Sequence, residues 1–185
     1  MVADVSGFLL RFLRDPESTG AIAPATRALA LKVAQATHEA YDRHAVSRKI
    51  GQPKLELIEL GAGTGALTRT IERLNPILVE QDEAWATLLK KNFPSLEVRV
   101  ECATQTLRAL VRPIGVVTSI PFFNNPQGGD IKRLLAKGYA SGLIKFCVLY
   151  TYGWSDPLVG AGFLEARRRH FVVYSFPPAS VWVYQ

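Results

Sequence analysis

The sequence predicts an α/β fold, built on a mostly parallel sheet of seven strands with helices on both faces. Short apolar runs of strand length alternate with stretches of helical periodicity along the chain. The 185 residues are 48% hydrophobic and 21% charged, which fits a globular chain and excludes a disordered one. No internal repeat or linker divides the chain, so we expect a single domain over residues 1–185.

The first part of this domain, residues 1–16, is predicted to form an amphipathic helix. Its apolar face and the arginines beside it suit a membrane interface, where we expect contacts from Phe8, Leu9, Arg11, Phe12, Leu13 and Arg14. A helix that only caps the core is the alternative.

A second helical segment is expected over residues 17–48. Its helix should begin near Pro24, since proline suits a first helical turn, and run to about His44. An apolar seam should pack against the sheet and consists of Leu29, Val33, Ala36 and Ala40.

The sheet core is expected over residues 54–185. Its strands are predicted at Leu55–Leu60, Ile77–Gln81, Glu97–Cys102, Gly115–Ile120, Ile144–Thr151, Phe171–Phe176 and Ser180–Tyr184. Helices are predicted between them at Ala66–Leu74, Glu83–Asn92, Gln105–Val111 and Asp130–Tyr139. Only Pro177-Pro178-Ala179 separates the last two strands, so they should pair antiparallel. A seven-stranded sheet with an antiparallel last strand is the Rossmann-like arrangement of class I methyltransferases.

The strongest local motif, Glu59-Leu60-Gly61-Ala62-Gly63-Thr64-Gly65, lies where the first core strand turns into a helix. Glycines allow a ligand close to the backbone there, and the helix start offers unpaired N–H groups. A methyltransferase would use Glu59 to hold the cationic amino group of S-adenosylmethionine. A dinucleotide would instead place its pyrophosphate on the helix end, and Gly61-x-Gly63-x-x-Ala66 fits that relaxed pattern. A tight turn without a ligand is the third interpretation.

Two further strand ends complete the expected cofactor site. Glu80, followed by Gln81, ends the second core strand, where a carboxylate can accept both ribose hydroxyls in either cofactor class. Cys102 and Ala103 follow the third strand, where methyltransferases usually carry an acid for the adenine amino group. A thiol is a poor acceptor, so we expect that contact to fall to a backbone carbonyl or to Thr104.

The fourth strand is followed by Ser119-Ile120-Pro121-Phe122, on the side where a methyl acceptor would lie. Adenine-N6 methyltransferases have Asn or Asp in place of Ser119. We expect Ser119 to contact the cofactor and the reacting group, and Pro121 and Phe122 to contact the substrate. A structural turn is the alternative.

Together these residues resemble the soluble bacterial phospholipid N-methyltransferases, which convert phosphatidylethanolamine to phosphatidylcholine. Besides the Glu59–Gly65 and Val79-Glu80 motifs, the resemblance includes Phe12-Leu13-Arg14, Thr19-Gly20-Ala21-Ile22-Ala23-Pro24, Tyr152-Gly153, Arg169-His170-Phe171 and Pro177-Pro178-Ala179 with Trp182 and Tyr184. Glu101-Cys102 departs from it, because the family usually has Gly-Asp there.

The resemblance implies S-adenosylmethionine as cofactor and a phospholipid head-group amine as acceptor. It also makes Tyr152 the best candidate for the residue that assists the amine, with His170 second at the substrate. The alternatives are an enzyme like the rRNA adenine-N6 dimethyltransferases that lacks their RNA-binding domain, an ornithine-lipid or small-amine N-methyltransferase, and a non-catalytic S-adenosylmethionine-binding membrane adaptor.

Charge and cysteine content bear on partners and location. The net charge of +6 suggests an anionic partner, and with the amphipathic N-terminus we expect an anionic membrane surface and no nucleic acid. Cys102 and Cys147 lie in apolar runs and are expected to be free, buried thiols in a reducing compartment. We therefore expect a cytoplasmic protein at the inner face of the cell membrane. No signal peptide, metal site or obligate protein partner is evident in the sequence.

Overall fold

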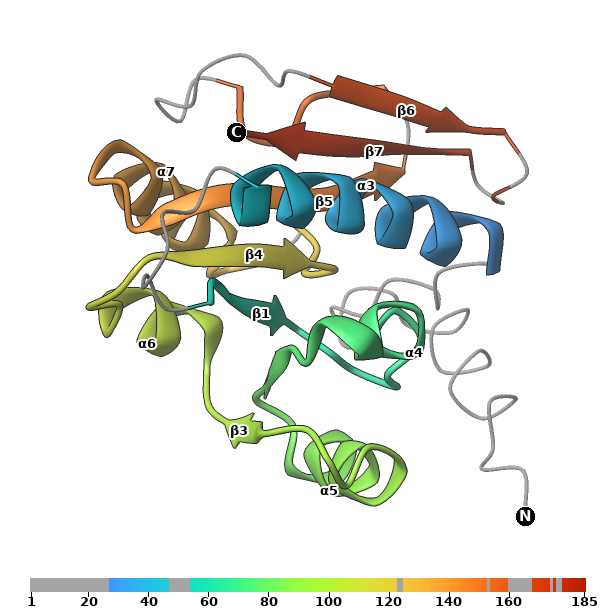
Figure 1. The fold of residues 1–185 in the computed structure, drawn as a ribbon, viewed down its shortest axis with the longest axis vertical. Coiled ribbons are helices and arrows are strands. Elements are labelled where there is room, and N and C mark those ends of the chain that lie inside the picture. Colours follow the sequence, from blue (N-terminus) through green and yellow to red (C-terminus); the bar gives the residue numbers. More distant parts are fainter. Residues whose placement is uncertain are drawn as a thin grey trace.

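The computed structural model describes residues 27–46, 54–122, 125–152, 154–159, 168–173, 175 and 178–185. Figure 1 shows the seven-stranded sheet, whose order is β3-β2-β1-β4-β5-β7-β6. Its strands are β1 (Glu56–Leu60), β2 (Ile77–Glu80), β3 (Val98–Val100), β4 (Ile114–Thr118), β5 (Ile144–Tyr152), β6 (Arg168–Val172) and β7 (Ala179–Tyr184). β1 to β5 pair in parallel, and β7 runs antiparallel to both β5 and β6. The predicted fold class is confirmed.

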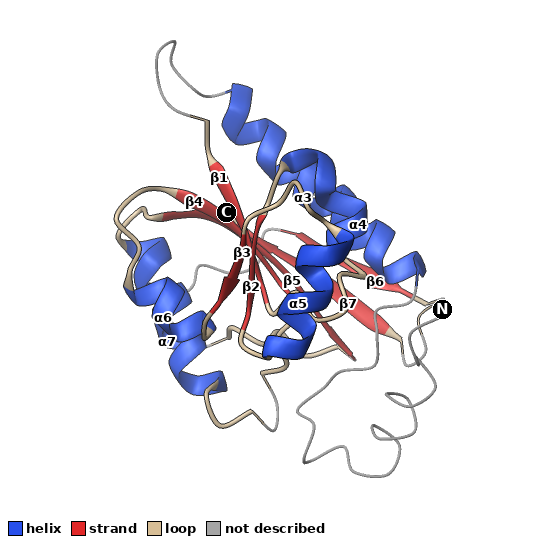
Figure 2. Ribbon diagram, turned by 90° about the horizontal axis from the view of Figure 1, so that it is seen from below, coloured by secondary structure: helices blue, strands red, loops and turns tan. Residues whose placement is uncertain are grey.

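Helices cover both faces of this sheet. They are α3 (Arg27–Val46), α4 (Thr68–Ile71), α5 (Glu83–Asn92), α6 (Ala103–Arg108) and α7 (Gly128–Ala140), with the 3₁₀ turn η1 (Glu72–Leu74) after α4. Figure 2 shows α3, α4 and α5 on one side of the sheet and α6 and α7 on the other. Among the described residues, none of the helices is both long enough and apolar enough to span a bilayer.

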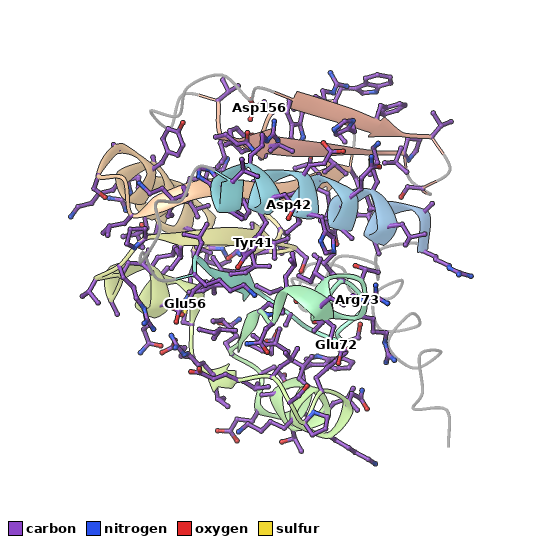
Figure 3. The ribbon with its side chains drawn as sticks, in the orientation of Figure 1. Tyr41, Asp42, Glu56, Glu72, Arg73 and Asp156 are labelled. Carbon is purple, nitrogen blue, oxygen red and sulfur yellow. The ribbon has the colours of Figure 1, made fainter. Side chains whose placement is uncertain are left out.

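α3 packs across the half of the sheet formed by β5, β7 and β6. The predicted seam of Leu29, Val33, Ala36 and Ala40 is buried, with at most 3% of any of these residues exposed. Burying a large apolar side chain such as Leu29 contributes about 1.5–3 kcal/mol. Tyr41, labelled in Figure 3, donates from its hydroxyl to the Leu55 carbonyl oxygen at 2.8 Å. This bond ties α3 to the chain that enters β1.

Most elements differ from the prediction by one or more residues at one end or both, among them β6, α4 and β3. β6 ends at Val172, because Val172 pairs with Ala179 and the exposed Val173 already begins the turn, so the predicted strand Phe171–Phe176 was placed too late. The predicted helix Ala66–Leu74 is divided into α4 and η1, and Asn75 ends it with a φ of 55°. β3 stops at Val100, so Cys102 lies outside the strand.

The prediction for the cysteines is therefore correct only in part. Both are free, and Cys147 is fully buried in β5. Cys102 is half-buried because it caps the start of α6 at the edge of the sheet.

Parallel strands end at a common edge, and this edge positions the candidate site. Leu60 of β1 lies between Val79 of β2 and Thr118 of β4, and Glu80 of β2 lies beside Val100 of β3. In open parallel sheets, ligands bind outside these carboxyl ends, where the strand order reverses. Here the order reverses between β1 and β4.

The predicted amphipathic helix, residues 1–16, lies outside the described residues. So do the membrane contacts expected from Phe8, Leu9, Arg11, Phe12, Leu13 and Arg14. Those expectations stay predictions.

Candidate functional site

The glycine-rich loop after β1 is bound to the end of β2. The amides of Gly61 and Ala62 both donate to the Val79 carbonyl oxygen, at 2.9 and 3.2 Å. Gly61, Gly63 and Gly65 all have positive φ, at 73°, 53° and 76°, which L-residues rarely adopt. The loop therefore has one defined path around the end of the strand.

Of the three loop glycines, only Gly63 faces open space. A Cβ at Gly61 would lie 2.6 Å from Ile120 Cγ1, and one at Gly65 would lie 2.4 Å from Phe93 Cε2. At Gly63 the nearest atom, the Gly61 carbonyl oxygen, would be 4.0 Å away. Gly61 and Gly65 thus allow close packing, whereas Gly63 leaves room for a ligand. Thr64, beside it, is half-buried.

Glu59, at the end of β1, has no exposed surface. Its Oε2 accepts a hydrogen bond from Thr68 Oγ1 at 2.8 Å, and its Oε1 has no partner. Burial raises the pKa of Glu59 to about 8, an effect that the bond from Thr68 partly offsets. A buried carboxylate with an unsatisfied oxygen is costly unless a cation or a donor meets it. Glu59 therefore fits a cationic amino group.

Glu80 ends β2, and its carboxylate accepts hydrogen bonds from the glycine loop and from the turn into α5. Its Oε2 accepts from the Gly63 amide at 2.8 Å, and its Oε1 accepts from the Asp82 amide at 2.9 Å. A carboxylate has about four lone-pair sites, so two neighbouring hydroxyls can still bind it. Gln81, which follows, is exposed.

Ser119, directly after β4, donates from Oγ to the Gly61 carbonyl oxygen at 2.7 Å. Thr118 Oγ1 donates to the Leu60 carbonyl oxygen at 3.2 Å and accepts from the Ile120 amide at 3.1 Å. The structure therefore brings Ser119 to the glycine loop, and its contact with the cofactor stays a prediction. The Ser119 hydroxyl proton is engaged there, which leaves its oxygen to act as an acceptor.

The turn from β3 into α6 is built around Cys102. Its amide donates to Gln105 Oε1 at 3.0 Å, and its Sγ lies 3.2 Å from Thr104 Oγ1. Thr104 and Ala103 are buried, and Ala103 packs in the core under α6 and α7. Cys102 Sγ also donates to Gln127 Oε1, at 2.9 Å, a contact that the sequence analysis did not anticipate.

On the expected acceptor side, Tyr152 ends β5 half-buried. Its ring meets Tyr150 edge-on, with 6.0 Å between centroids, and burial raises the pKa of its hydroxyl. His170 lies on β6 opposite Val181, which in turn pairs with Tyr150. Tyr152 and His170 thus share the sheet face under α3 but lie on strands separated by β7.

Pro121 and Phe122 have structural contacts of their own. The Pro121 carbonyl oxygen accepts from Asn125 Nδ2 at 3.0 Å. Phe122 is 8% exposed and packs with Ile131 and Leu135 in the core. Core packing accounts for Phe122, and its substrate contact stays a prediction.

A cation–aromatic cluster lies on the opposite face of β6 and β7. Trp154 stacks on Phe171 with 4.1 Å between ring centroids. Arg169 lies 5.1 Å from the ring centroids of both Trp154 and Trp182. Arg169 Nε donates to Ser180 Oγ at 3.4 Å, and within the described part of the chain Arg169 forms no ion pair. The sequence analysis did not anticipate the pairing of Trp154 with Arg169.

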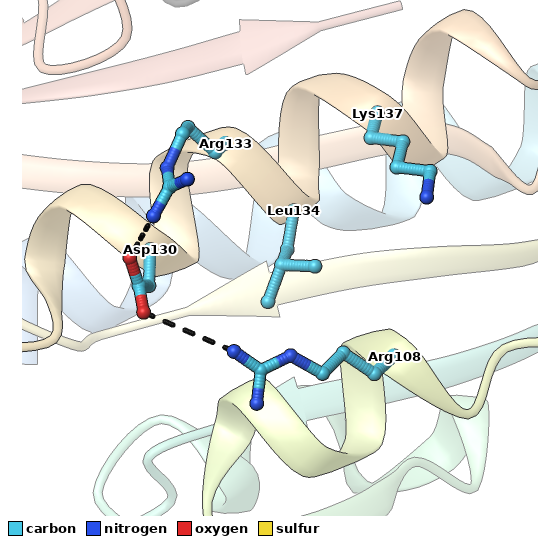
Figure 4. Close-up of a pocket in the computed structure, with 5 residues that line it drawn as sticks. All are labelled: Arg108, Asp130, Arg133, Leu134 and Lys137. Carbon is cyan, nitrogen blue, oxygen red and sulfur yellow. Dashed lines mark hydrogen bonds and ion pairs between the residues drawn. The ribbon is translucent and has the colours of Figure 1, made fainter.

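A separate groove of about 360 Å³ lies between α6 and α7 and is lined by Arg108, Asp130, Arg133, Leu134 and Lys137 (Figure 4). Asp130 pairs with Arg133 and, at 3.8 Å, with Arg108. These exposed pairs contribute little to stability. Within the described ranges, no group of His, Cys, Asp and Glu could hold a metal ion.

The architecture around this site matches solved structures of known methyltransferases. One is magnesium protoporphyrin IX methyltransferase from Synechocystis PCC 6803 with bound S-adenosylmethionine, at 11% identity, TM-score 0.55, and coverage of 81% of this chain and 77% of that one. Another is a provisionally assigned RNA methyltransferase from Pyrococcus horikoshii, at 16% identity, TM-score 0.57, and 83% coverage of each chain.

A third is the bifunctional kinase-methyltransferase WbdD, at 15% identity and TM-score 0.58, where the match covers 82% of this chain and 38% of that one. The chain has the Rossmann-like fold of class I methyltransferases. No protein-family model and no curated protein sequence matches it.

The raised pKa of Glu59 makes the free energy of unfolding depend on pH. Its folded pKa, about 8, lies above the ordinary 4.5, so the folded protein holds the proton more tightly than the unfolded chain does. Its stabilising effect is complete below the ordinary value and is lost as the pH rises through about 8. Between about pH 5 and pH 8, the free energy of unfolding should fall by on the order of 3 kcal/mol more in the wild type than in Glu59→Gln.

Urea titrations of both proteins at each pH measure this difference. Glu97→Gln, at an exposed carboxyl, is the control and should follow the wild type. Parallel pH profiles for the wild type and Glu59→Gln would show that Glu59 is not buried as described.

Proposed function

We propose that the protein is an S-adenosylmethionine-dependent N-methyltransferase whose acceptor is a phospholipid head-group amine. Two observations support S-adenosylmethionine as the cofactor: the buried, half-satisfied carboxyl group of Glu59 at the end of β1, and the open space at Gly63 in the loop that follows. This carboxyl group offers nothing to the negative pyrophosphate of a dinucleotide and would repel it once ionised. It favours a ligand with a cationic amino group.

Two strand ends and the loop between them would hold this cofactor. Glu59 would bind the amino group of the cofactor, and Glu80 would bind its ribose hydroxyls. Because Gly63 has no side chain, the rest of the cofactor has room beside the loop. The open space at Gly63 and the free oxygen of Glu59 fit such a ligand. When bound, the cofactor supplies an activated methyl group to an attacking amine lone pair.

An amine acceptor must be deprotonated before it can attack. With a pKa near that of lysine, ~10.4, about one amine in a few thousand is free at neutral pH, which corresponds to roughly 4–5 kcal/mol. Burial raises the pKa of Tyr152, so its hydroxyl is protonated at neutral pH and cannot act as the base. We therefore assign Tyr152 to orienting the amine, with its oxygen as acceptor, and Ser119 to the cofactor side of the same edge.

The family resemblance and the surroundings of Arg169 both support a phospholipid acceptor. A guanidinium that is flanked by two tryptophans and has no carboxylate partner among the described residues suits a phosphate group. The net charge of +6 favours an anionic membrane surface, and we place the enzyme at the cytoplasmic face.

Replacing Gly63 tests the cofactor site. Gly63→Val adds a branched side chain in the space proposed for the ligand and should weaken binding of S-adenosylhomocysteine at least tenfold by calorimetry. Gly142→Val is the matched control, because Gly142 also has positive φ and open surroundings but lies before β5, at the opposite edge of the sheet. Equal affinity in the two variants, both shown to be folded by circular dichroism, would refute this site.

Labelling tests the acceptor. Incubation with methyl-labelled S-adenosylmethionine, mixed phospholipids and RNA should place label in phosphatidylethanolamine derivatives, separated by thin-layer chromatography. Tyr152→Phe should lower turnover about tenfold, near 1.4 kcal/mol, because its hydroxyl only orients the amine. Loss of a general base would instead cost 10²–10⁴-fold. Tyr139→Phe, at the far end of α7, should not change turnover.

Label in RNA or a soluble amine, with none in lipid, would refute the phospholipid acceptor. Label in ornithine lipid alone would keep the membrane enzyme and overturn the named substrate.

A further inference from the structure

The turn after β3 and the start of α7 meet through one side-chain contact. Cys102 caps α6, Gln127 caps α7, and the Cys102 thiol donates to Gln127 Oε1 at 2.9 Å. The Gln127 amide donates to Asn125 Oδ1 at 2.9 Å, which holds the residue in place. Two segments 25 residues apart thereby place a side-chain carboxamide next to the end of β3.

This position matters because β3 neighbours β2, whose Glu80 is the proposed ribose ligand. A base attached to a ribose held at Glu80 reaches the ends of β3 and β4, where it needs a hydrogen-bond acceptor for the exocyclic amine of adenine. Cys102 lacks a strong acceptor atom. The Glu101 carboxylate is tied to α6, where its Oε1 accepts from Thr106 Oγ1 at 2.8 Å, and Thr104 is buried against the thiol.

Gln127 has the groups that adenine requires. Its Oε1 has two lone pairs, of which the thiol uses one, and its side chain is exposed at the edge of the sheet. A carboxamide can bind adenine with two hydrogen bonds, accepting from the exocyclic amine and donating to a neighbouring ring nitrogen. Donation from Cys102 orients the carboxamide so that its oxygen points toward β3.

We propose that Gln127 is the adenine-recognition residue of the cofactor site, and that it takes the place of an acid at position 102. The proposal rests on the proposed cofactor and is independent of the methyl acceptor. Gln127 supplies the carbonyl oxygen for the adenine amine, and Cys102 is a positioning residue that acts through it.

Selectivity for the base tests this assignment. Calorimetry compares S-adenosylhomocysteine with S-inosylhomocysteine, in which a carbonyl oxygen replaces the adenine amine. The wild type should prefer the adenine ligand, and Gln127→Ala should reduce that preference about tenfold. Gln127 lies at the surface, so the variant should fold.

Two further variants separate recognition from structure. Gln105→Ala removes the cap on the Cys102 amide but leaves the Gln127 carbonyl, so it should keep the wild-type preference. Cys102→Asp in the Gln127→Ala background supplies a carboxylate acceptor and should restore the preference.

The outcomes distinguish this inference from the proposed function. If the wild type binds S-adenosylhomocysteine and Gln127→Ala keeps the full preference for it, the assignment of Gln127 is wrong and the cofactor site stands. If the wild type binds neither ligand, the proposed function fails and the assignment fails with it. A loss of preference in Gln105→Ala equal to that in Gln127→Ala would show a structural effect at α6 and would also overturn the proposal.

Discussion

Glu59 lies at the end of β1 with no exposed surface, and only one of its two carboxylate oxygens has a hydrogen-bond partner. A folded protein rarely leaves such a group unsatisfied, because an ionised carboxylate here would have lost its water and gained no cation in return, so the group holds its proton instead. The elements around it are arranged to keep it there. Thr68, at the start of α4, holds one oxygen, and the glycine loop carries the chain from Glu59 to Thr68. The other oxygen is buried without a partner, and it is the atom that we assign to the amino group of the ligand.

The position of Glu59 depends on how the strand ends are joined. Val79 accepts two amides from the glycine loop, Glu80 accepts a third, and Thr118 and Ser119 donate to the carbonyl oxygens of Leu60 and Gly61. β1, β2 and β4 are thereby connected at one edge. Displacing any one of these ends would shift the loop, and with it the distance between the proposed amino and ribose contacts. Preorganisation of this kind lowers the entropy that binding must overcome.

The periodicity of the sequence predicted most of the fold, and the positions of Glu59 and Glu80 followed from it, because strand-end residues of a parallel sheet gather at one edge. α5 was predicted at its exact bounds, and in the structure Asp82 caps its start by accepting from the Ala84 and Trp85 amides. β6 was misplaced because the run from Phe171 to Phe176 is mostly apolar, and only pairing with β7 decides the register. The contact between Cys102 and Gln127 could not be predicted, because an exposed glutamine before a helix has no periodic signature.

The central claim is that the buried carboxylate of Glu59 receives the cationic amino group of the cofactor, and proton release on binding measures this directly. With a pKa of about 8, Glu59 is mostly protonated at neutral pH in the free protein and must ionise to pair with the amine. Calorimetry of S-adenosylhomocysteine binding at about pH 7, in buffers with different ionisation enthalpies, should show the release of close to one proton by the wild type and almost none by Glu59→Gln. Binding without net proton release by the wild type, or equal release by both proteins, would contradict the account.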